Sequence, residues 1–485
     1  MSRVVILGAG VSGHTAASFA RRWLGRTHEV VVVSPLADYN WIPSNIWVGV
    51  GLMAPSDVTF ALAPVYERHG IVFKQARAVE IHPEGREGDP APYVVIEFTG
   101  GAASGTREDV RYDFLINATG PKLNFGATPG LGPDGGHSLS VCTETHADET
   151  SRHLDELVAR MQRGERGRFL VGTGHGSCTC EGAAFEYVVN LEFELRRRGV
   201  RDRADIWWLS NEYELGDFGM GGLHLRQGGY VTSSKVFTES LFAERGIHWI
   251  TRAHVREVEA GLAHYETLDG TERSFAFDFA MLLPPFSGVG LTALDRKGAD
   301  ITAQLFQPNG FMKVDADYAS KPYEAWSPAD WPSTYQSPGY QNVFAVGIAF
   351  APPHAISKPR KAPSGAPIAP APPRTGMPSA TIGKAVAQSI VDMIGGAPGP
   401  TRRASMAKMG AACVASAGAS LLTGTAASMT VFPIVPDVER YPPYGRDLAG
   451  TFGEIGLAGH WVKVLLHHAF LHKARLRPGW QLIPE

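Results

Sequence analysis

Short apolar runs alternate with a helical pattern at the start of the chain. Val4–Leu7 is uniformly apolar, Ala16–Arg22 continues as a helix, and Val30–Val33 is a second apolar run. Uniformly apolar runs of this length are typical of strands buried on both faces of a parallel sheet. A strand, a helix and a second strand in this order predict a βαβ unit.

Three glycines, Gly8, Gly10 and Gly13, lie in the turn between this first strand and the helix. In such a unit the spacing G-x-G-x-x-G predicts a dinucleotide site, because the glycines allow a tight turn, a close pyrophosphate and a closely packed helix. The helix N-terminus then faces the anion. Ser34-Pro35 stands where an acidic residue usually binds a ribose, which weakens a simple NAD assignment.

A second βαβ unit is predicted further along. Its strand is Gly167–Val171, its turn 172–180 contains glycines and two cysteines, and its helix ends in Arg196–Gly199, a typical helix terminus. Residues 112–120 form a strand that ends in an Ala-Thr-Gly turn, and 342–348 adds a late strand, as in an FAD domain split around an inserted domain. We therefore predict an α/β fold with two Rossmann-like dinucleotide-binding domains and a C-terminal membrane-associating region.

The predicted organisation has four parts. Residues 1–160 form the first part of the FAD-binding domain and 161–280 the second Rossmann-like domain. Residues 281–377 return to the FAD-binding domain with an extended Pro-rich loop at 352–373, and 378–485 form the C-terminal region.

Two C-terminal segments are unusual. The 28 residues between Lys408 and Asp437 carry no charge, which exceeds the roughly 20 residues of a membrane span. Because Gly, Ser, Thr and Ala dominate, we interpret them as packed strands, with a transmembrane helix as the lesser alternative. In 461–476, Val462, Leu465, Leu466, Ala469 and Phe470 form one apolar stripe. That pattern fits a helix lying in a membrane surface or one docked on the protein body.

Composition narrows the function. With 485 residues and a formal net charge of −3, the chain has no basic excess for nucleic acid. Its four cysteines, Cys142, Cys178, Cys180 and Cys413, are too few for a disulfide framework. Cys180 lies in the first turn of a predicted helix, where the dipole favours a thiolate. The N-terminus shows no signal peptide, so we expect no export.

Several segments in order resemble the sulfide:quinone oxidoreductase family of two-dinucleotide-domain flavoproteins. The resemblance spans nearly the whole chain. The segments that carry it are Ser34-Pro35, 43–51, 118–123, 140–147, 180–186, 283–286, 342–348 and 374–376, with Cys413 where a further cysteine is expected.

The resemblance implies a function and a site. FAD is expected to be held by Gly8, Gly10, Gly13, Ser34, Pro43, Asn45, Thr119, Gly120, Gly347 and Ile348. Cys180 and Cys413 are implied as the redox pair that bridges sulfur, with Cys142 at the flavin and His146 tuning or deprotonating a sulfur species. A surface histidine at a helix start is an equally good interpretation of His146. Sulfide is the expected substrate, with polysulfide or sulfane sulfur as product and a membrane quinone as acceptor. The resemblance also implies a membrane-associated homo-oligomer and suggests a trimer.

Some residues depart from the family. Asp217 stands where a histidine is frequent, and Cys178 is an extra cysteine. Asp217 and Glu186 are weaker acid–base candidates, and we expect Glu186 to be solvated on its helix. Phe432 and Trp461 are loose candidates for lining a quinone path.

Alternative functions stay open at this point. A type II NADH:quinone oxidoreductase would use Glu212 for the ribose, although Ser177 replaces the third glycine of the second turn. A flavocytochrome sulfide dehydrogenase subunit would need a secretion signal, and a non-catalytic sulfur-binding or redox-sensing flavoprotein is a further class. His175, Cys178 and Cys180 are too irregularly spaced for a zinc site, and no metal is predicted.

Overall fold

The computed structural model describes residues 1–179, 181–418 and 420–485. An eight-stranded mixed sheet has the order β21-β8-β1-β2-β5-β6-β7, with β20 paired to β5. From β21 to β5 the neighbours are parallel, as predicted for the buried apolar runs. The strands are β1 (Arg3–Leu7), β2 (Glu29–Ser34), β5 (Val72–His82), β6 (Tyr93–Phe98), β7 (Arg107–Arg111), β8 (Phe114–Asn117), β20 (Thr292–Ala293) and β21 (Val343–Ala345).

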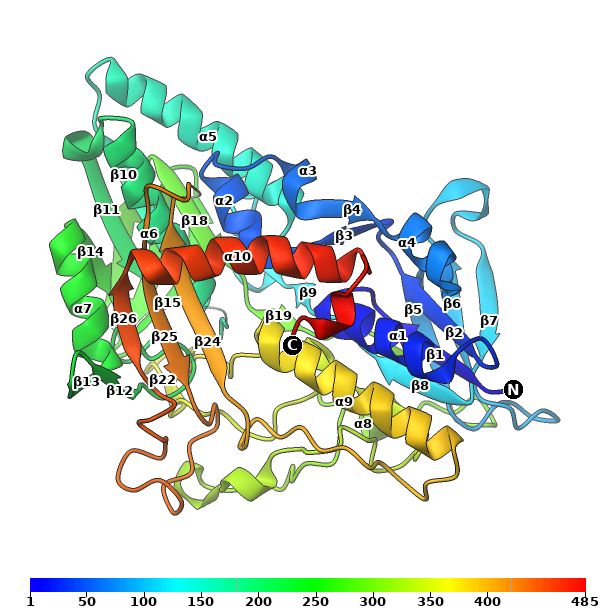
Figure 1. Cartoon of the computed structure of the whole chain (residues 1–485). Helices are drawn as coiled ribbons and strands as arrows, with labels where there is room; N and C mark the ends of the chain where they lie inside the picture. The colour runs from blue at the N-terminus through cyan, green and yellow to red at the C-terminus, as the bar shows by residue number, and fades with distance from the viewer. Residues whose placement is uncertain (180, 419) are drawn as a thin grey trace.

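Two long helices, α1 (Val11–Leu24) and α9 (Gly376–Ile394), pack closely against each other beside this sheet (Figure 1). Their approach depends on glycine, because a Cβ at Gly383 would collide with the backbone oxygen of Ser12. Helix α9, which lies late in the chain, is therefore part of the same structural unit as the N-terminal β1, α1 and β2.

A second, four-stranded parallel sheet has the order β14-β11-β10-β18. The helices around it and an adjoining three-stranded antiparallel sheet complete this part of the fold (Figure 1). The elements are α5 (Glu144–Gln162), β10 (Gly167–Thr173), α6 (Glu181–Arg197), β11 (Ala204–Leu209), α7 (Ser234–Arg245), β14 (Ile247–Ile250), β15 (Ala253–Glu259), β16 (Leu262–Thr267), β17 (Glu272–Ala276) and β18 (Phe279–Leu283).

The uncharged C-terminal segment forms strands, as predicted. β24 (Ala411–Ala417), β25 (Thr425–Val431) and β26 (Gly453–Gly456) make an antiparallel sheet, and α10 (Leu457–Ala474) lies across it (Figure 1). Within the described part of the chain, none of the helices combines the length and apolar character needed to cross a bilayer.

The remaining elements are short. They are β3 (Asp38–Asn40), α2 (Asn45–Gly49), α3 (Pro55–Val58), β4 (Thr59–Ala61), α4 (Leu62–His69), β9 (Lys122–Leu123), β12 (His224–Gln227), β13 (Tyr230–Ser233), β19 (Phe286–Ser287), α8 (Thr302–Leu305), β22 (Arg360–Lys361) and β23 (Pro367–Ile368). The predicted mixed α/β class is confirmed.

Candidate active site

The first glycine turn has an open helix N-terminus. Gly8 has φ +104°, and a Cβ on Gly8 would collide with Ala118, while one on Gly13 would collide with Gly8. A Cβ on Gly10, by contrast, would meet nothing within 4 Å. Gly10 is the N-cap of α1, no side chain caps it, and the first turn holds no acidic residue. The backbone N–H groups of this helix end are therefore available to an anion.

Several predicted cofactor residues follow neighbouring parallel strands and lie at one edge of the large sheet. Gly8 follows β1, Ser34 ends β2, Thr119 follows β8, and Gly347 follows β21. The carboxyl ends of parallel strands are where α/β folds bind ligands. Gly120 has φ +73° and Gly347 has φ +63°, so both turns use a conformation that favours glycine.

Asn45 is tied to protein groups. Its amide exchanges hydrogen bonds of 2.8 and 2.9 Å with Asn40, and its Nδ2 donates to the Val141 carbonyl at 3.3 Å. Asn45 is fully buried, whereas Pro43, two residues earlier, is partly exposed. Asn45 thereby connects the Pro43 loop to the segment that carries Cys142.

Cys413 lies beside the start of α6. A Cβ on Gly182 would be 3.4 Å from Cys413 Sγ, and β24 packs along α6. Cys180 lies outside the described residues, but its neighbours Thr179 and Glu181 belong to this same turn. Tertiary structure thus brings the Cys413 thiol, 231 positions from Gly182 in sequence, to the helix turn that follows Cys180.

The described thiols differ in their surroundings. Burial raises the pKa of Cys142 to about 11, and burial followed by the charge of Glu186 raises the pKa of Cys413 to about 11. Cys178 is fully buried and its Sγ donates to the Leu283 carbonyl at 2.9 Å. Burial raises its pKa well above the usual range, so Cys178 is a structural thiol.

Glu186 is not solvated, so that expectation is wrong. It is buried where α6, β24 and α10 meet, and it pairs with Lys463 of α10 at 3.0 Å. The Ser416 N–H donates to its other oxygen at 3.3 Å, and Ser416 Oγ contacts His460 Nδ1 at 2.6 Å. Burial raises the pKa of Glu186, while Lys463 opposes the change. This buried network fixes the strand that carries Cys413.

His146 lies in the first turn of α5, close to the Cys142 segment. Its N–H donates to the capping Thr143, and its Nε2 is 3.6 Å from an Asp134 carboxylate oxygen. Its Nδ1 is buried and has no hydrogen-bond partner among the described residues. The ring therefore has one nitrogen near the surface at Asp134 and one in the protein interior. Its role in tuning a sulfur species stays a prediction.

The second glycine turn is covered by the Pro-rich segment. The Ala369 N–H donates to the Gly176 carbonyl at 2.8 Å and the Ala371 N–H to the Cys178 carbonyl at 3.0 Å. A Cβ on Gly176 would collide with the Pro367 carbonyl. The segment 367–371 therefore lies directly on the turn where a second dinucleotide would place its pyrophosphate.

Three carboxyl groups form a cluster near the start of α6, and this cluster was not predicted from the sequence. Glu181 is the first residue of α6, and Glu212 and Asp217 come from the loop after β11. Glu212 is fully buried; its Oε2 accepts from Ser210 Oγ at 2.7 Å and its Oε1 from the Phe218 N–H at 2.9 Å. A ribose role for Glu212 belongs to the NADH alternative, and the hydrogen bonds within its own loop disfavour that role. A carboxylate directly after Cys180, at the first residue of the predicted helix, was the available signal.

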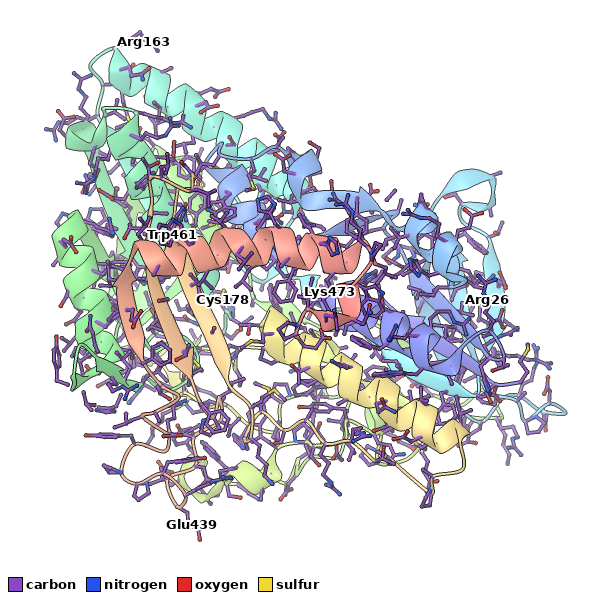
Figure 2. All side chains as sticks on the ribbon, viewed as in Figure 1. Arg26, Arg163, Cys178, Glu439, Trp461 and Lys473 are labelled. Carbon is purple, nitrogen blue, oxygen red and sulfur yellow. The ribbon has the colours of Figure 1, made fainter. Side chains whose placement is uncertain are left out.

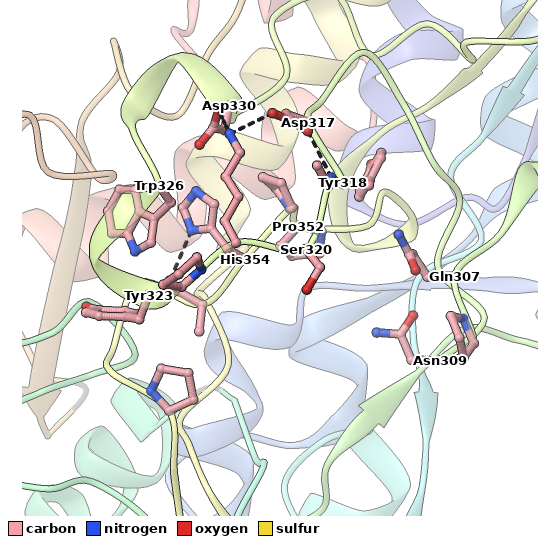
Figure 3. A pocket seen from close by; sticks show the side chains of 17 residues that line it. Gln307, Asn309, Asp317, Tyr318, Ser320, Tyr323, Trp326, Asp330, Pro352 and His354 are labelled. Atoms are coloured by element: carbon pink, nitrogen blue, oxygen red, sulfur yellow. Dashed lines mark hydrogen bonds and ion pairs between the residues drawn. The ribbon is translucent and has the colours of Figure 1, made fainter.

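A pocket of about 550 Å³ lies among the loops at 307–323 and 352–359 (Figure 3). Lys321 Nζ is held there by Asp317 and Asp330, and the His354 ring stacks on Trp326. Among residues 1–179, 181–418 and 420–485, no group of three or more His, Cys, Asp and Glu side chains is arranged to hold a metal ion.

Helix α10 is docked on the body and still presents an apolar face. Val464, His467 and Leu471 face inward, and Phe470 stacks on Trp41. The predicted stripe is therefore divided, because Val462 and Leu465 point outward. We define the α10 surface as the exposed apolar side chains Leu421, Leu422, Ile455, Leu457, Trp461, Val462 and Leu465.

Trp461 marks the start of α10, and Lys473 lies near its end (Figure 2). Trp461 Nε1 donates to the Leu421 carbonyl at 2.7 Å, just ahead of β25. Phe432 follows the last residue of β25. The two loose candidates for a quinone path thus lie at opposite ends of this strand and are not brought together.

The chain is similar to sulfide-oxidising flavoproteins. It is 29% identical over 472 residues to the sulfide-quinone reductase of Aquifex aeolicus, covering 97% of this chain and 91% of that protein. It is 21% identical over 350 residues to the mitochondrial sulfide:quinone oxidoreductase of Dictyostelium discoideum, covering 72% and 65%. No protein-family model matches the chain.

Solved structures give the same result. The X-ray structure of the sulfide:quinone oxidoreductase from Aquifex aeolicus matches with a TM-score of 0.76 at 27% identity, over 98% of this chain and 92% of that one. NDH2 from Plasmodium falciparum in complex with NADH matches with a TM-score of 0.60 at 12% identity, over 98% and 96%, and shows the fold alone. The resemblance to the sulfide:quinone oxidoreductase family is confirmed.

Proposed function

We propose, proceeding from this resemblance, that the chain is an FAD-dependent sulfide:quinone oxidoreductase that holds oxidised sulfur between Cys180 and Cys413. The observation that carries the proposal is the position of Cys413 Sγ beside Gly182, in the helix turn directly after Cys180. Two cysteines in one place supply an electrophilic sulfur for sulfide and a thiol for the following exchange.

FAD is the proposed cofactor, and the residues present fit it. The uncapped start of α1, with open space beside Gly10, suits a pyrophosphate. Gly8, Gly13, Ser34, Thr119, Gly120, Gly347, Ile348 and Pro43 would hold the remainder of the group, and Asn45 would position the Cys142 segment. When bound, the flavin accepts two electrons from sulfide and passes them to a quinone.

The covered second turn favours sulfide over NADH as the electron donor. The segment 367–371 lies where a nicotinamide nucleotide would place its phosphates, and Glu212 is buried and hydrogen-bonded within its own loop. The second glycine turn and the Glu212 carboxylate, which a type II NADH:quinone oxidoreductase would use to bind NADH, therefore both make contacts within the protein instead.

The α10 surface is the proposed contact with the membrane that supplies the quinone. Leu422 is 88% exposed and Leu465 is 67% exposed. Trp461 lies on the same helix as Leu465, and its Nε1 donates to the carbonyl of Leu421, next to Leu422. Exposed aliphatic side chains beside a tryptophan are characteristic of proteins that lie in a membrane interface. Trimeric assembly remains a prediction from the family resemblance.

Rapid mixing with sulfide, followed by flavin bleaching and reduction of a short-chain quinone, tests the proposal. We expect Cys180→Ser and Cys413→Ser each to abolish bleaching, with the double variant scarcely worse because the two residues act as a unit. Cys142→Ser should be intermediate and still bind FAD.

Cys178→Ser is the matched control, because Cys178 is buried in the same turn but its thiol donates a hydrogen bond to the Leu283 carbonyl. It should bleach almost normally. Near-normal bleaching in Cys413→Ser, or faster bleaching by NADH than by sulfide in the wild type, would overturn the assignment.

A further inference from the structure

A second pocket, of about 490 Å³, lies at the end of α10 and is lined by basic side chains. Arg68 and His69 come from the last turn of α4, Arg475 caps α10, and Arg477 lies two residues beyond that cap. Among the described residues, no Asp or Glu lines this pocket. The fold therefore gathers four basic side chains from two distant parts of the chain around one hollow.

These positive charges are not neutralised by the protein. Arg68 Nε donates to a backbone carbonyl of its own helix at 2.9 Å, and Arg475 Nη2 donates to a carbonyl of β4 at 3.4 Å. Within the described part of the chain, no carboxylate forms an ion pair with either of them, with Arg477 or with His69. Burial and then the charge of Arg477 lower the pKa of Arg475, so these two cations repel each other.

Helix ends explain only part of this arrangement. Basic residues in the last turn of a helix are favoured by the helix dipole, and that accounts for Arg68 and His69 on α4. It does not account for Arg477, which lies beyond the end of α10 and whose guanidinium makes no hydrogen bond to the described residues. Burial and then the charge of Arg68 lower the pKa of His69. The pocket therefore has the character of an anion site.

The pocket continues the exposed face of α10. Positions three and four residues apart lie on one face of a helix, and Trp461, Leu465, His468, His472 and Arg475 follow one another at that spacing. The first three of these side chains are exposed. At 1.5 Å per residue, Arg475 lies about 15 Å beyond Leu465 along the helix. This face is therefore apolar at the start of α10 and basic at its end.

The phosphate group of a membrane lipid matches this combination. Lipid phosphates lie in the headgroup layer, directly outside the acyl chains that exposed aliphatic side chains contact. Guanidinium groups bind phosphate oxygens through paired N–H bonds. Leu482 follows the pocket residue Gln481 and is 82% exposed, so an apolar side chain lies beside the basic pocket. Basic clusters next to such a surface are typical of proteins that recognise anionic lipids.

We propose that Arg68, His69, Arg475 and Arg477 bind the phosphate group of an anionic phospholipid and thereby orient α10 on the membrane. The proposal rests on the membrane contact of the proposed function, and it adds the class of lipid that this contact recognises. The pocket holds the end of α10 at the headgroups, while the apolar side chains at the start of α10 lie toward the acyl chains.

Flotation of the flavin-loaded protein with lipid vesicles tests this site. Wild type and Arg68→Gln/Arg477→Gln are each mixed with phosphatidylcholine vesicles, with and without phosphatidylglycerol. Wild type should bind more tightly when phosphatidylglycerol is present. The double variant should bind those vesicles about 30-fold more weakly, the equivalent of about 1 kcal/mol for each basic residue near a charged membrane. Its binding to phosphatidylcholine alone and its bleaching by sulfide should match wild type.

Arg163→Gln/Arg166→Gln is the matched control. It removes the same charge from two exposed arginines just beyond the end of α5, well away from the end of α10 marked by Lys473 (Figure 2). Attraction between exposed charges is screened beyond about 8 Å at physiological salt, so this variant should bind both kinds of vesicle as wild type does. Equal losses in the two double variants, or no gain from phosphatidylglycerol in wild type, would overturn the lipid site.

Two further measurements separate the alternatives. Calorimetric titration with inorganic phosphate should show far weaker binding than phosphatidylglycerol vesicles; saturable phosphate binding without a preference for phosphatidylglycerol would replace the lipid by a free anion. Leu465→Glu should weaken binding to both kinds of vesicle. If wild type binds neither kind, the membrane contact of the proposed function fails together with the site, whereas equal binding to both kinds refutes the lipid site alone.

Discussion

Glu212→Gln is expected to stabilise the protein, and only at neutral and higher pH. Glu212 is fully buried, and burial raises the pKa of its carboxyl from 4.5 to about 7. A carboxyl that binds its proton more tightly in the folded state contributes fully to stability below the unfolded pKa. That contribution is lost as the pH rises from about 4.5 to about 7.

The size of the effect follows from the shift. At 1.36 kcal/mol per pH unit, a rise from 4.5 to about 7 corresponds to about 3 kcal/mol of stability lost at high pH. Glutamine has the shape of the protonated acid and retains an acceptor for the Phe218 N–H, which Glu212 binds at 2.9 Å. The variant should therefore match wild type near pH 4.5 and exceed it by up to about 3 kcal/mol above pH 7.

Urea unfolding followed by tryptophan fluorescence, repeated at several pH values, measures this difference. Glu214→Gln is the control, because its side chain is 47% exposed and its charge is solvated; its curve should run parallel to wild type. If Glu212→Gln also runs parallel to wild type, Glu212 is not a neutral buried carboxyl, and the argument from its burial is refuted.

Two further predictions concern the cofactor and the membrane. Gly10→Leu should fold normally by circular dichroism but lack bound flavin, because the added side chain enters open space beside the α1 N-terminus; a yellow variant with full flavin content would refute the assignment of this turn. Leu465→Glu should reduce binding to lipid vesicles at least about tenfold, given that burying one leucine is worth about 1.5–3 kcal/mol. Val236→Glu, at an exposed valine on α7, is the control and should leave flotation with vesicles unchanged. If the two variants bind vesicles equally well, the α10 surface is not the membrane contact.

Features that depend on neighbouring residues could be predicted from the amino-acid sequence. The βαβ order, the turn at Gly8–Gly13 and the uncharged strands near Cys413 follow from apolar runs, glycine spacing and small residues within a few positions. The ordered motifs also predicted the family resemblance. Each of these signals acts locally, so each can be read along the chain.

Contacts between segments that are distant in sequence could not be predicted and become visible in the folded chain. Cys413 reaches the first turn of α6 because β24 packs along that helix, and 367–371 covers the second glycine turn. Glu186 was expected to be solvated, yet it is buried and paired with Lys463 of α10, and Glu212, which the NADH alternative would use at a ribose, is fully buried. Burial, and with it the protonation of these carboxyls, depends on what other elements pack against a residue, and no local pattern encodes that.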